Sequence, residues 1–207
     1  MKLYTGPLSL FSKKVEVALD EKAIACERIS VPFSLETLYE PKHPDVVRLN
    51  PKAQVPVLVD GELAVYDSTL IFEYLEARVP EPPLYPIDLA GKTLCRQAEL
   101  EADEVFFPHA FALFPHRDVP DAEREAARNG IADHYRRLDG RLGDRKYLFE
   151  RFSVADISHF LVSQFTEMLG VPVPSELRFL RAWQDRIGGR PSVAPHVATM
   201  REAAGMG

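Results

Sequence analysis

Cysteine is scarce in this sequence, and its histidines are not grouped. The two cysteines, Cys26 and Cys95, are too few for a disulfide framework and do not have the spacing of a metal-binding motif. The six histidines are scattered along the chain, so the sequence indicates no cluster of metal ligands. We therefore expect neither a disulfide-stapled fold nor a metal site, and we predict that both cysteines are reduced, buried thiols.

The sequence also lacks long apolar runs and runs of one charge. No stretch approaches the roughly 18 apolar residues of a membrane-spanning helix, and the first residues, MKLYTGP, lack the apolar core of a signal peptide. Acidic residues outnumber basic ones by 31 to 25, and no Lys/Arg-rich run occurs, which argues against binding to nucleic acid or to anionic membranes. These absences predict a cytoplasmic protein whose partner is a small molecule or another protein.

The first part of the chain alternates strand and helix patterns. We predict a strand at residues 2–5, a helix in SKKVEVALDEKAI, a strand in ERISV and a short helix that ends near Leu49. The apolar run 55–59, a turn at Asp60-Gly61 and the segment GELAVYDS predict a hairpin whose second strand lies at the sheet edge. An amphipathic helix follows in STLIFEYLEARV. The order βαβ, α, ββα predicts a small mixed sheet with helices on its faces, an α/β domain.

The composition changes at VPEPPLYP, residues 79–86, which contains four prolines and is typical of a linker between domains. Strand patterns cease beyond it, and helical patterns occupy residues 90–115, 121–142, 153–169 and 175–188. The sequence therefore predicts an α/β domain at residues 1–78, a linker at 79–87 and an all-helical domain at 88–207.

Pro56 interrupts an apolar run in NPKAQVPVLVDGE. A proline cannot donate a hydrogen bond to a β-ladder, so one interpretation is a junction between a loop and a strand. The other is a cis-proline that turns the backbone of Val55 toward a ligand. These residues alone leave both interpretations open.

Four motifs in order resemble the cytosolic glutathione transferases along nearly the whole chain. They are LYTGPLSLFSKKVEVAL, LNPKAQVPVLVDGE, YDSTLIFEYLEARVP and FSVADI. The resemblance implies a thioredoxin-like domain that binds glutathione, followed by an all-helical domain. Among these transferases, the chain is similar to bacterial, serine-type members of the theta and zeta kind.

The resemblance assigns glutathione-binding roles to several residues. The dipeptide Val55-Pro56 is a cis-proline site whose Val55 backbone pairs with the cysteinyl residue of glutathione, as in the addition of a strand to a sheet edge. Ser68 holds the γ-glutamyl carboxylate at a helix N-terminus, and Asp67 faces the ammonium group, although both residues also suit an N-cap. Further candidates for the glycine carboxylate are Lys42, His43 and Gln54.

Ser9, at the junction of the first strand and the first helix, matches the catalytic serine of the serine-using classes. A hydroxyl donor at a helix N-terminus lowers a thiol pKa because it donates to the anion and adds the field of the helix. Ser12 is the alternate donor, and either serine also suits a structural N-cap. Tyr4 points to the opposite face of the strand from the tyrosine of the tyrosine-using classes, so we expect Tyr4 in the core.

The resemblance also implies a pocket for an apolar electrophile and a homodimer. Candidates for the pocket are Leu8, Leu10, Phe107 and Phe111, and candidates for a contact with the glutathione of the partner subunit are Asp103 and Glu104. The FSVADI segment predicts a capping box of Ser153 and Asp156, with a role in folding.

The function expected from the resemblance is conjugation of the glutathione thiolate to a small apolar electrophile, with glutathione as co-substrate and no metal. The chain is also similar to stringent starvation protein A, a non-catalytic member of the fold that binds RNA polymerase. That protein lacks the serine at position 9 and has a Pro-His-Pro motif where this chain has Pro80-Glu81-Pro82. A zeta-like isomerase is a further alternative, but Leu10 and Phe11 replace the second and third residues of its Ser-Ser-Cys motif.

Overall fold

The computed structural model describes residues 1–115 and 117–206. The chain forms two compact units. The first combines Met1–Pro83 with Pro191–Gly207, and the second is Leu84–Arg190. This grouping differs from the boundaries expected from the sequence in one segment, because residues 191–207 associate with the N-terminal unit.

The first unit contains a four-stranded mixed sheet in the order β2-β1-β3-β4. Its strands are β1 (Lys2–Thr5), β2 (Glu27–Ser30), β3 (Val57–Asp60) and β4 (Leu63–Tyr66). The β1 strand pairs parallel with β2 and antiparallel with β3, and β3 and β4 form the predicted hairpin with β4 at the edge. The predicted mixed sheet is confirmed.

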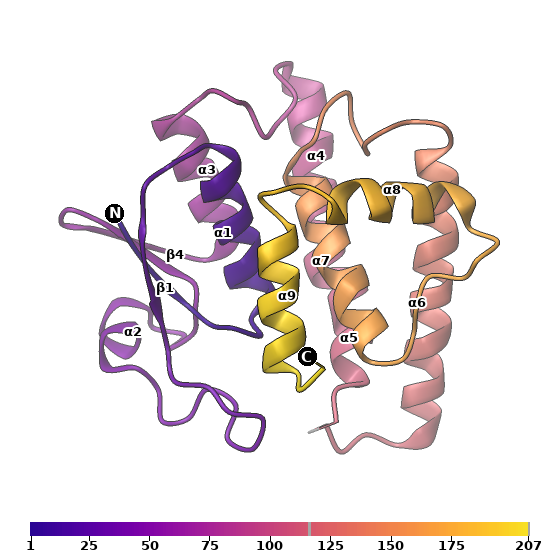
Figure 1. The fold of residues 1–207 in the computed structure, drawn as a ribbon, viewed down its shortest axis with the longest axis horizontal. Coiled ribbons are helices and arrows are strands. Elements are labelled where there is room, and N and C mark those ends of the chain that lie inside the picture. Colours follow the sequence, from indigo (N-terminus) through magenta and orange to yellow (C-terminus); the bar gives the residue numbers. More distant parts are fainter. Residues whose placement is uncertain (116, 207) are drawn as a thin grey trace. The chain divides into compact units, whose positions relative to one another are not determined.

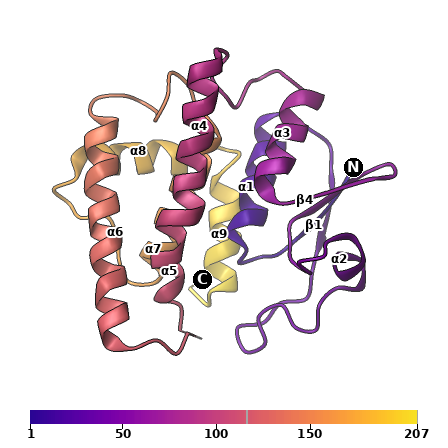
Figure 2. The same cartoon turned by 180° about the vertical axis from the view of Figure 1, so that it is seen from behind.

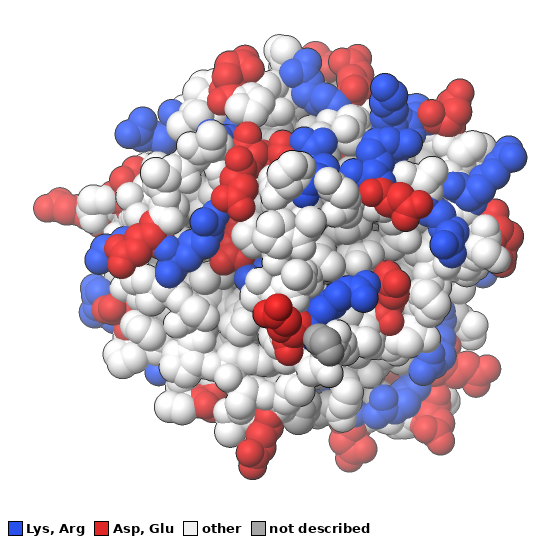
Figure 3. Space-filling model, in the orientation of Figure 1, with Lys and Arg blue, Asp and Glu red and all other residues white. Residues whose placement is uncertain are grey.

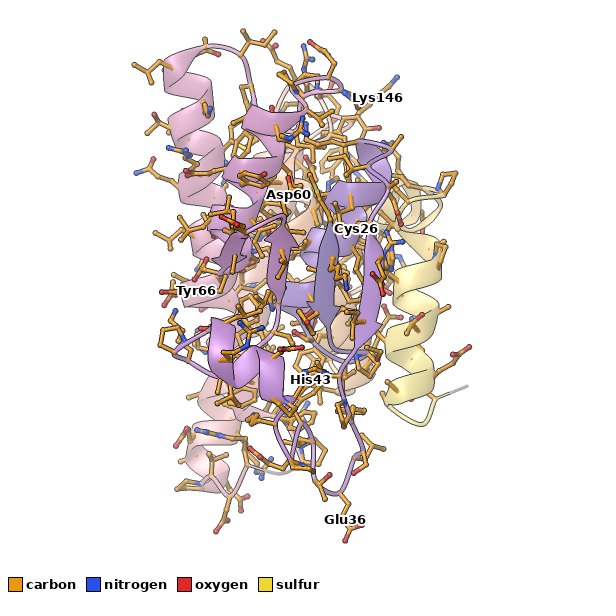
Figure 4. The ribbon with its side chains drawn as sticks, turned by 90° about the vertical axis from the view of Figure 1, so that its left-hand side faces the viewer. Cys26, Glu36, His43, Asp60, Tyr66 and Lys146 are labelled. Carbon is orange, nitrogen blue, oxygen red and sulfur yellow. The ribbon has the colours of Figure 1, made fainter. Side chains whose placement is uncertain are left out.

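Helices cover both faces of this sheet. The helices of the first unit are α1 (Leu10–Glu21), α2 (Pro44–Leu49), α3 (Ser68–Arg78) and α9 (Ala194–Ala203). The α1 and α3 helices pack together on one face, and α2 lies on the other (Figures 1 and 4). Under α2, a small apolar cluster contains Tyr4, Val31, Val46 and Val57. Tyr4 is therefore a core residue, as predicted.

The α9 helix was not expected from the sequence, where Pro191 and Pro195 obscure its pattern. It packs beside α1 (Figures 1 and 2). A buried polar network joins the two helices to the end of β1. Glu16 accepts a hydrogen bond from Thr5 Oγ1 at 2.9 Å and lies 2.6 Å from Lys13 Nζ. His196 of α9 contacts Glu16 at 3.3 Å and Asp20 at 2.7 Å.

The second unit is helical over its described residues. Its segments are α4 (Leu89–Glu101), the π-helical η1 (Ala102–Phe106), α5 (Phe107–Ala112), α6 (Asp121–Leu142), α7 (Val154–Met168) and α8 (Arg178–Gly188). The predicted helix at 90–115 is thus divided into α4, η1 and α5, and the one expected from 175 begins at 178. The α7 helix is buried along most of its length because it packs against α4, η1, α5 and α8.

The predicted capping box at the start of α7 is present and is part of a larger network. One carboxylate oxygen of Asp156 accepts hydrogen bonds from the backbone N–H of Ser153 at 3.0 Å and from its hydroxyl at 2.8 Å. The other accepts from the Leu148 N–H at 2.9 Å and from Trp183 Nε1 at 2.8 Å. Asp156 therefore joins the loop before α7 to α8.

On the face shown in Figure 3, acidic and basic side chains are interspersed. Within the part of the chain that the structure describes, no helix combines the length and the apolar character that crossing a bilayer requires.

Candidate functional site

The predicted binding segments meet at one end of the sheet. The register places Tyr4, Val57 and Tyr66 side by side on β1, β3 and β4. The loop to Ser9 follows β1, the dipeptide Val55-Pro56 precedes β3, and the start of α3 follows β4. Figure 4 shows His43 and Tyr66 toward this end and Cys26 and Asp60 toward the other. Segments that are up to sixty residues apart in the sequence therefore surround one place.

The Val55–Pro56 peptide bond is cis, as the second interpretation of this dipeptide requires. Pro56 is buried, whereas Val55 is half-buried and lies before the first residue of β3. The Asn50 side chain donates a hydrogen bond of 2.6 Å to the Gln54 carbonyl and so fixes the approach to the dipeptide. The backbone of Val55 thus lies just outside the strand ladder, where an added peptide could pair with it.

At the start of α3, Asp67 is the N-cap and its carboxylate accepts from the Thr69 N–H at 3.1 Å. Asp67 has φ of 76°, and Ser68, the first helical residue, is 3% exposed. Lys52 Nζ lies 3.6 Å from the other carboxylate oxygen of Asp67. Nothing in NPKAQ distinguishes Lys52 from any solvated lysine, so the sequence did not indicate this contact.

The two candidate serines have different environments. Ser9 is the N-cap of α1, is half-buried, and its Oγ accepts from the Ser12 N–H at 3.2 Å. Ser12 is 0% exposed, and its Oγ accepts from the Gly6 N–H at 3.3 Å. Each hydroxyl thus accepts one backbone hydrogen bond, and the two serines differ in their exposure. The geometry therefore favours Ser9 over Ser12 as a donor to a ligand.

The three residues expected to bind the glycine carboxylate of glutathione differ in their contacts and exposure. His43 is the N-cap of α2, its Nδ1 accepts from the Asp45 N–H at 3.2 Å, and its ring lies 5.2 Å from the Tyr4 ring. Lys42 Nζ lies 3.3 Å from a Glu40 carboxylate oxygen. Gln54 is exposed next to Val55. Gln54 thus adjoins Val55 in the chain, and His43 contacts Tyr4 of β1.

The apolar candidates belong to both units. Leu8 and Leu10, in the loop after β1 and at the start of α1, are 9% and 4% exposed. In the second unit, the Phe107 and Phe111 rings stack with centroids 5.6 Å apart, and Phe111 is 38% exposed. The Phe165 ring lies 6.3 Å from Phe107. The second unit thus presents an aromatic cluster with one exposed member.

Asp103 and Glu104 both lie on η1, where Asp103 is half-buried and Glu104 is exposed. Cys26 and Cys95 are free thiols, as predicted, but only Cys95 is buried. Burial raises the pKa of Cys95 to about 11, so this thiol is poorly nucleophilic at neutral pH. In residues 1–115 and 117–206, no group of three or more His, Cys, Asp or Glu side chains is arranged to hold a metal ion.

Family models match both units. The model of the glutathione S-transferase N-terminal domain matches residues 3–83, and that of the C-terminal domain matches residues 102–191. The chain belongs to the glutathione S-transferase family. Glutathione S-transferase 2 of Saccharomyces cerevisiae is 31% identical over 93% of this chain and 88% of the yeast protein.

Two further relatives show how broad the family is. A stringent starvation protein A homolog of Coxiella burnetii is 28% identical over 100% of this chain and 97% of the relative. A solved glutathione S-transferase from Methylobacterium radiotolerans, in complex with glutathione sulfonate, superposes with a TM-score of 0.79 at 26% identity, over 95% of this chain and 93% of the other. Because the relatives carry both names, family membership alone does not distinguish a transferase from a stringent starvation protein.

Proposed function

We propose that this protein is a glutathione transferase that conjugates the thiolate of glutathione to a small apolar electrophile. The observation that carries the proposal is the position of Ser9. Its half-buried hydroxyl caps α1 at the same sheet end as the cis Val55–Pro56 dipeptide and the start of α3.

In this proposal, glutathione binds in an extended conformation along the sheet end. The N–H and C=O of Val55 pair with the cysteinyl backbone, and these main-chain hydrogen bonds fix the register of the tripeptide. The backbone N–H of Ser68 holds the γ-glutamyl carboxylate at the start of α3, and Asp67 holds the ammonium. The exposed Gln54, with His43 and Lys42 from the connection before α2, provides the glycine carboxylate with donors.

Ser9 then acts on the sulfur. A free thiol has a pKa near 8.5, so only a few per cent of it is thiolate at neutral pH. A hydrogen bond from Ser9 Oγ and the field at the start of α1 stabilise the anion, and the proton leaves to solvent. A depression of about two units makes the thiol mostly thiolate and corresponds to about 2.7 kcal/mol. The sulfur lone pair forms a bond to an electrophilic carbon, and the leaving group departs with its bonding electrons or, in an addition, the adjacent atom takes a proton.

The apolar candidates would bind the electrophile. Leu8 and Leu10 adjoin Ser9 in the sequence, and the exposed Phe111 with Phe107 presents an aromatic surface on the second unit. We also propose a homodimer, supported by exposed apolar residues on α4 and η1, which include Leu94, Leu100 and Val105. Asp103 and Glu104 lie on the same η1 segment and would contact the glutathione of the partner subunit.

The second candidate function is a non-catalytic adaptor that binds RNA polymerase, which the resemblance to stringent starvation protein A implies. Its support is the similarity along the whole chain to the Coxiella burnetii relative of that name. A serine at position 9 and a glutamate at position 81, in place of the histidine of the adaptor motif, favour the transferase. Leu10 and Phe11 disfavour a zeta-like isomerase in the same way.

The deciding experiment is calorimetric titration of the protein with reduced glutathione, together with the pH dependence of the thiolate absorbance of the bound peptide. A transferase should bind glutathione and show a bound-thiol pKa clearly below that of free glutathione. The control is γ-glutamyl-alanyl-glycine, which has no thiol and should bind without the absorbance change. If millimolar glutathione does not bind, the transferase proposal is wrong and the adaptor is favoured.

A further inference from the structure

The loop that carries Ser9 is held in part by a residue from another segment. Every backbone N–H that residues 6–9 possess has a partner in the structure. The Gly6 N–H donates to Ser12 Oγ at 3.3 Å, and the Ser9 N–H donates to the Gly6 carbonyl at 3.2 Å. The Leu8 N–H donates instead to the hydroxyl of Tyr39, at 3.1 Å, thirty-one residues along the chain.

The ring of Tyr39 also lies directly against Gly6. A β-carbon built on Gly6 would come within 2.6 to 2.8 Å of the Cε1, Cζ and hydroxyl oxygen atoms of Tyr39. Real β-carbons do not approach other atoms so closely, because the repulsion is too strong. Gly6 thus lets the ring contact the loop backbone, and the hydroxyl of the same side chain accepts from Leu8.

Tyr39 itself is held firmly in the connection between β2 and α2. Its ring packs on Phe33 with centroids 4.9 Å apart and borders the apolar cluster under α2. The preceding residue, Leu38, has φ of 54°, a left-handed conformation that a β-carbon disfavours. The Leu38 carbonyl accepts from the Ser34 N–H at 3.0 Å, which closes the turn before Tyr39. The contacts that hold Leu38 in this conformation also fix the direction in which the Tyr39 side chain leaves the backbone.

We propose that Tyr39 is a positioning residue, which sets the loop after β1 so that the Ser9 hydroxyl faces the sulfur of bound glutathione. The assignment rests on the proposed function and adds a residue that no motif in the sequence marks. Tyr39 acts through the loop, at Gly6 and Leu8, and is not itself a donor to the thiolate. Burial raises the pKa of the Tyr39 hydroxyl well above its usual range, so the hydroxyl stays neutral throughout the pH range in which the thiol titrates.

The test compares Tyr39→Phe with the matched change Tyr74→Phe. Tyr39→Phe keeps the ring and removes the acceptor of the Leu8 N–H. Tyr74→Phe removes a hydrogen bond of 2.6 Å to Asp60, at the turn of the β3–β4 hairpin and away from the loop. Three quantities are to be measured in each protein. They are the thiol pKa of bound glutathione, from thiolate absorbance, the kcat and KM for glutathione, and the rate of hydrogen exchange at the Leu8 amide.

Tyr39→Phe should raise the bound-thiol pKa by about half a unit to one unit, which lowers the thiolate fraction up to about tenfold at a pH below both values. We expect kcat to fall accordingly, KM for glutathione to change less than about threefold, and the rate to recover at higher pH. Exchange at Leu8 should accelerate. In Tyr74→Phe, the thiol pKa and Leu8 exchange should stay as in the unaltered protein.

Three outcomes would overturn the assignment, and the first is distinguishable from the other two. If the unaltered protein does not bind glutathione, the proposed function fails and the assignment fails with it. If it binds glutathione but Tyr39→Phe leaves the bound-thiol pKa and Leu8 exchange unchanged, the proposed function stands and Tyr39 has no positioning role. A second variant, Gly6→Ala, pushes the ring away and should raise the thiol pKa in the same direction. An unchanged pKa in a folded Gly6→Ala protein would also contradict the assignment.

Discussion

Ser9 and Ser153 occupy the same position at the start of a helix, but their surroundings differ. Ser153 caps α7, is 0% exposed, and both its hydroxyl and its N–H donate to Asp156 three residues later. At the matching position of α1 stands Ser12, which supplies only a backbone N–H to Ser9. The cap of α7 is closed by a carboxylate inside the core, whereas Ser9 at the cap of α1 is half-buried and has no carboxylate at the matching position. One residue type at one helix position is thus enclosed in the core of one unit and half-buried in the other, where we propose that it acts on glutathione.

The buried acids of the same two helices differ in a parallel way. Asp156 of α7 accepts only from neutral donors, and burial raises its pKa above the usual value. Burial also opposes ionisation of Glu16 in α1, but hydrogen bonds and charge from His196 and Lys13 outweigh it and lower its pKa to about 2. In Glu16 the nearby charged groups and hydrogen bonds outweigh burial, whereas in Asp156 burial outweighs the hydrogen bonds from neutral donors.

The largest expected effect on stability comes from removing the Asp156 carboxylate, which closes the cap of α7. Asp156→Ala should lower the free energy of unfolding by about 3 to 5 kcal/mol, because it leaves the Leu148 and Ser153 N–H groups and Trp183 Nε1 buried without acceptors. Denaturant unfolding, followed by the fluorescence of the single tryptophan, Trp183, measures it.

Ser153→Ala is the matched control for that change. It removes one hydroxyl and keeps the carboxylate, so the loss should be only about 1 to 2 kcal/mol. Equal losses in the two variants would show that the cap, and not the wider Asp156 network, holds this region together.

The second prediction concerns the loss of stability at low pH, to which Glu16 contributes. The pKa of Glu16 is lowered from an ordinary 4.5 to about 2, so its contribution is present above the unfolded value and is lost as pH falls through that interval. The loss should total about 3 kcal/mol between about pH 5 and pH 2. Unfolding free energies across this range, compared with those of Glu16→Gln, measure it. If the variant shows the same pH dependence, the contribution comes from other groups.

The third prediction sharpens the comparison of the serines. Ser9→Ala should lower turnover at least about tenfold, equivalent to about 1.4 kcal/mol of transition-state stabilisation, and leave the fold intact. Both variants should lower stability by about 1 kcal/mol, because the Ser12 N–H loses its acceptor in Ser9→Ala and the Gly6 N–H loses its acceptor in Ser12→Ala. Ser12→Ala should have the smaller effect on turnover. Steady-state kinetics and thermal unfolding of both variants measure the two effects. Turnover that is unchanged in Ser9→Ala would point to Ser12 or to backbone donors.

Much of the fold could be predicted because its signals are local. The period of apolar residues indicated the strands and α1 to α3, and the Asp60-Gly61 turn indicated the hairpin. Where sequence reasoning failed, a distant contact was decisive. The α9 helix begins at Ala194, next to Pro195 and shortly after Pro191, and it is stabilised by packing on α1. The helix predicted at 90–115 is divided by η1, whose Phe106 ring stacks on His134 of α6 with centroids 4.0 Å apart.

The features of the candidate site can be separated in the same way, into those set by local sequence and those set by distant contacts. The sequence by itself determined that Ser9, Val55-Pro56 and Asp67-Ser68 lie at the ends of strands or the starts of helices, because proline, serine and aspartate act on the backbone next to them. Only the tertiary structure decided that β1, β3 and β4 bring these ends together, that Ser12 is buried while Ser9 is half-buried, and that Tyr39 contacts the loop between β1 and α1. Burial and contact across thirty or more residues depend on how the whole sheet and its helices pack, which no local pattern encodes.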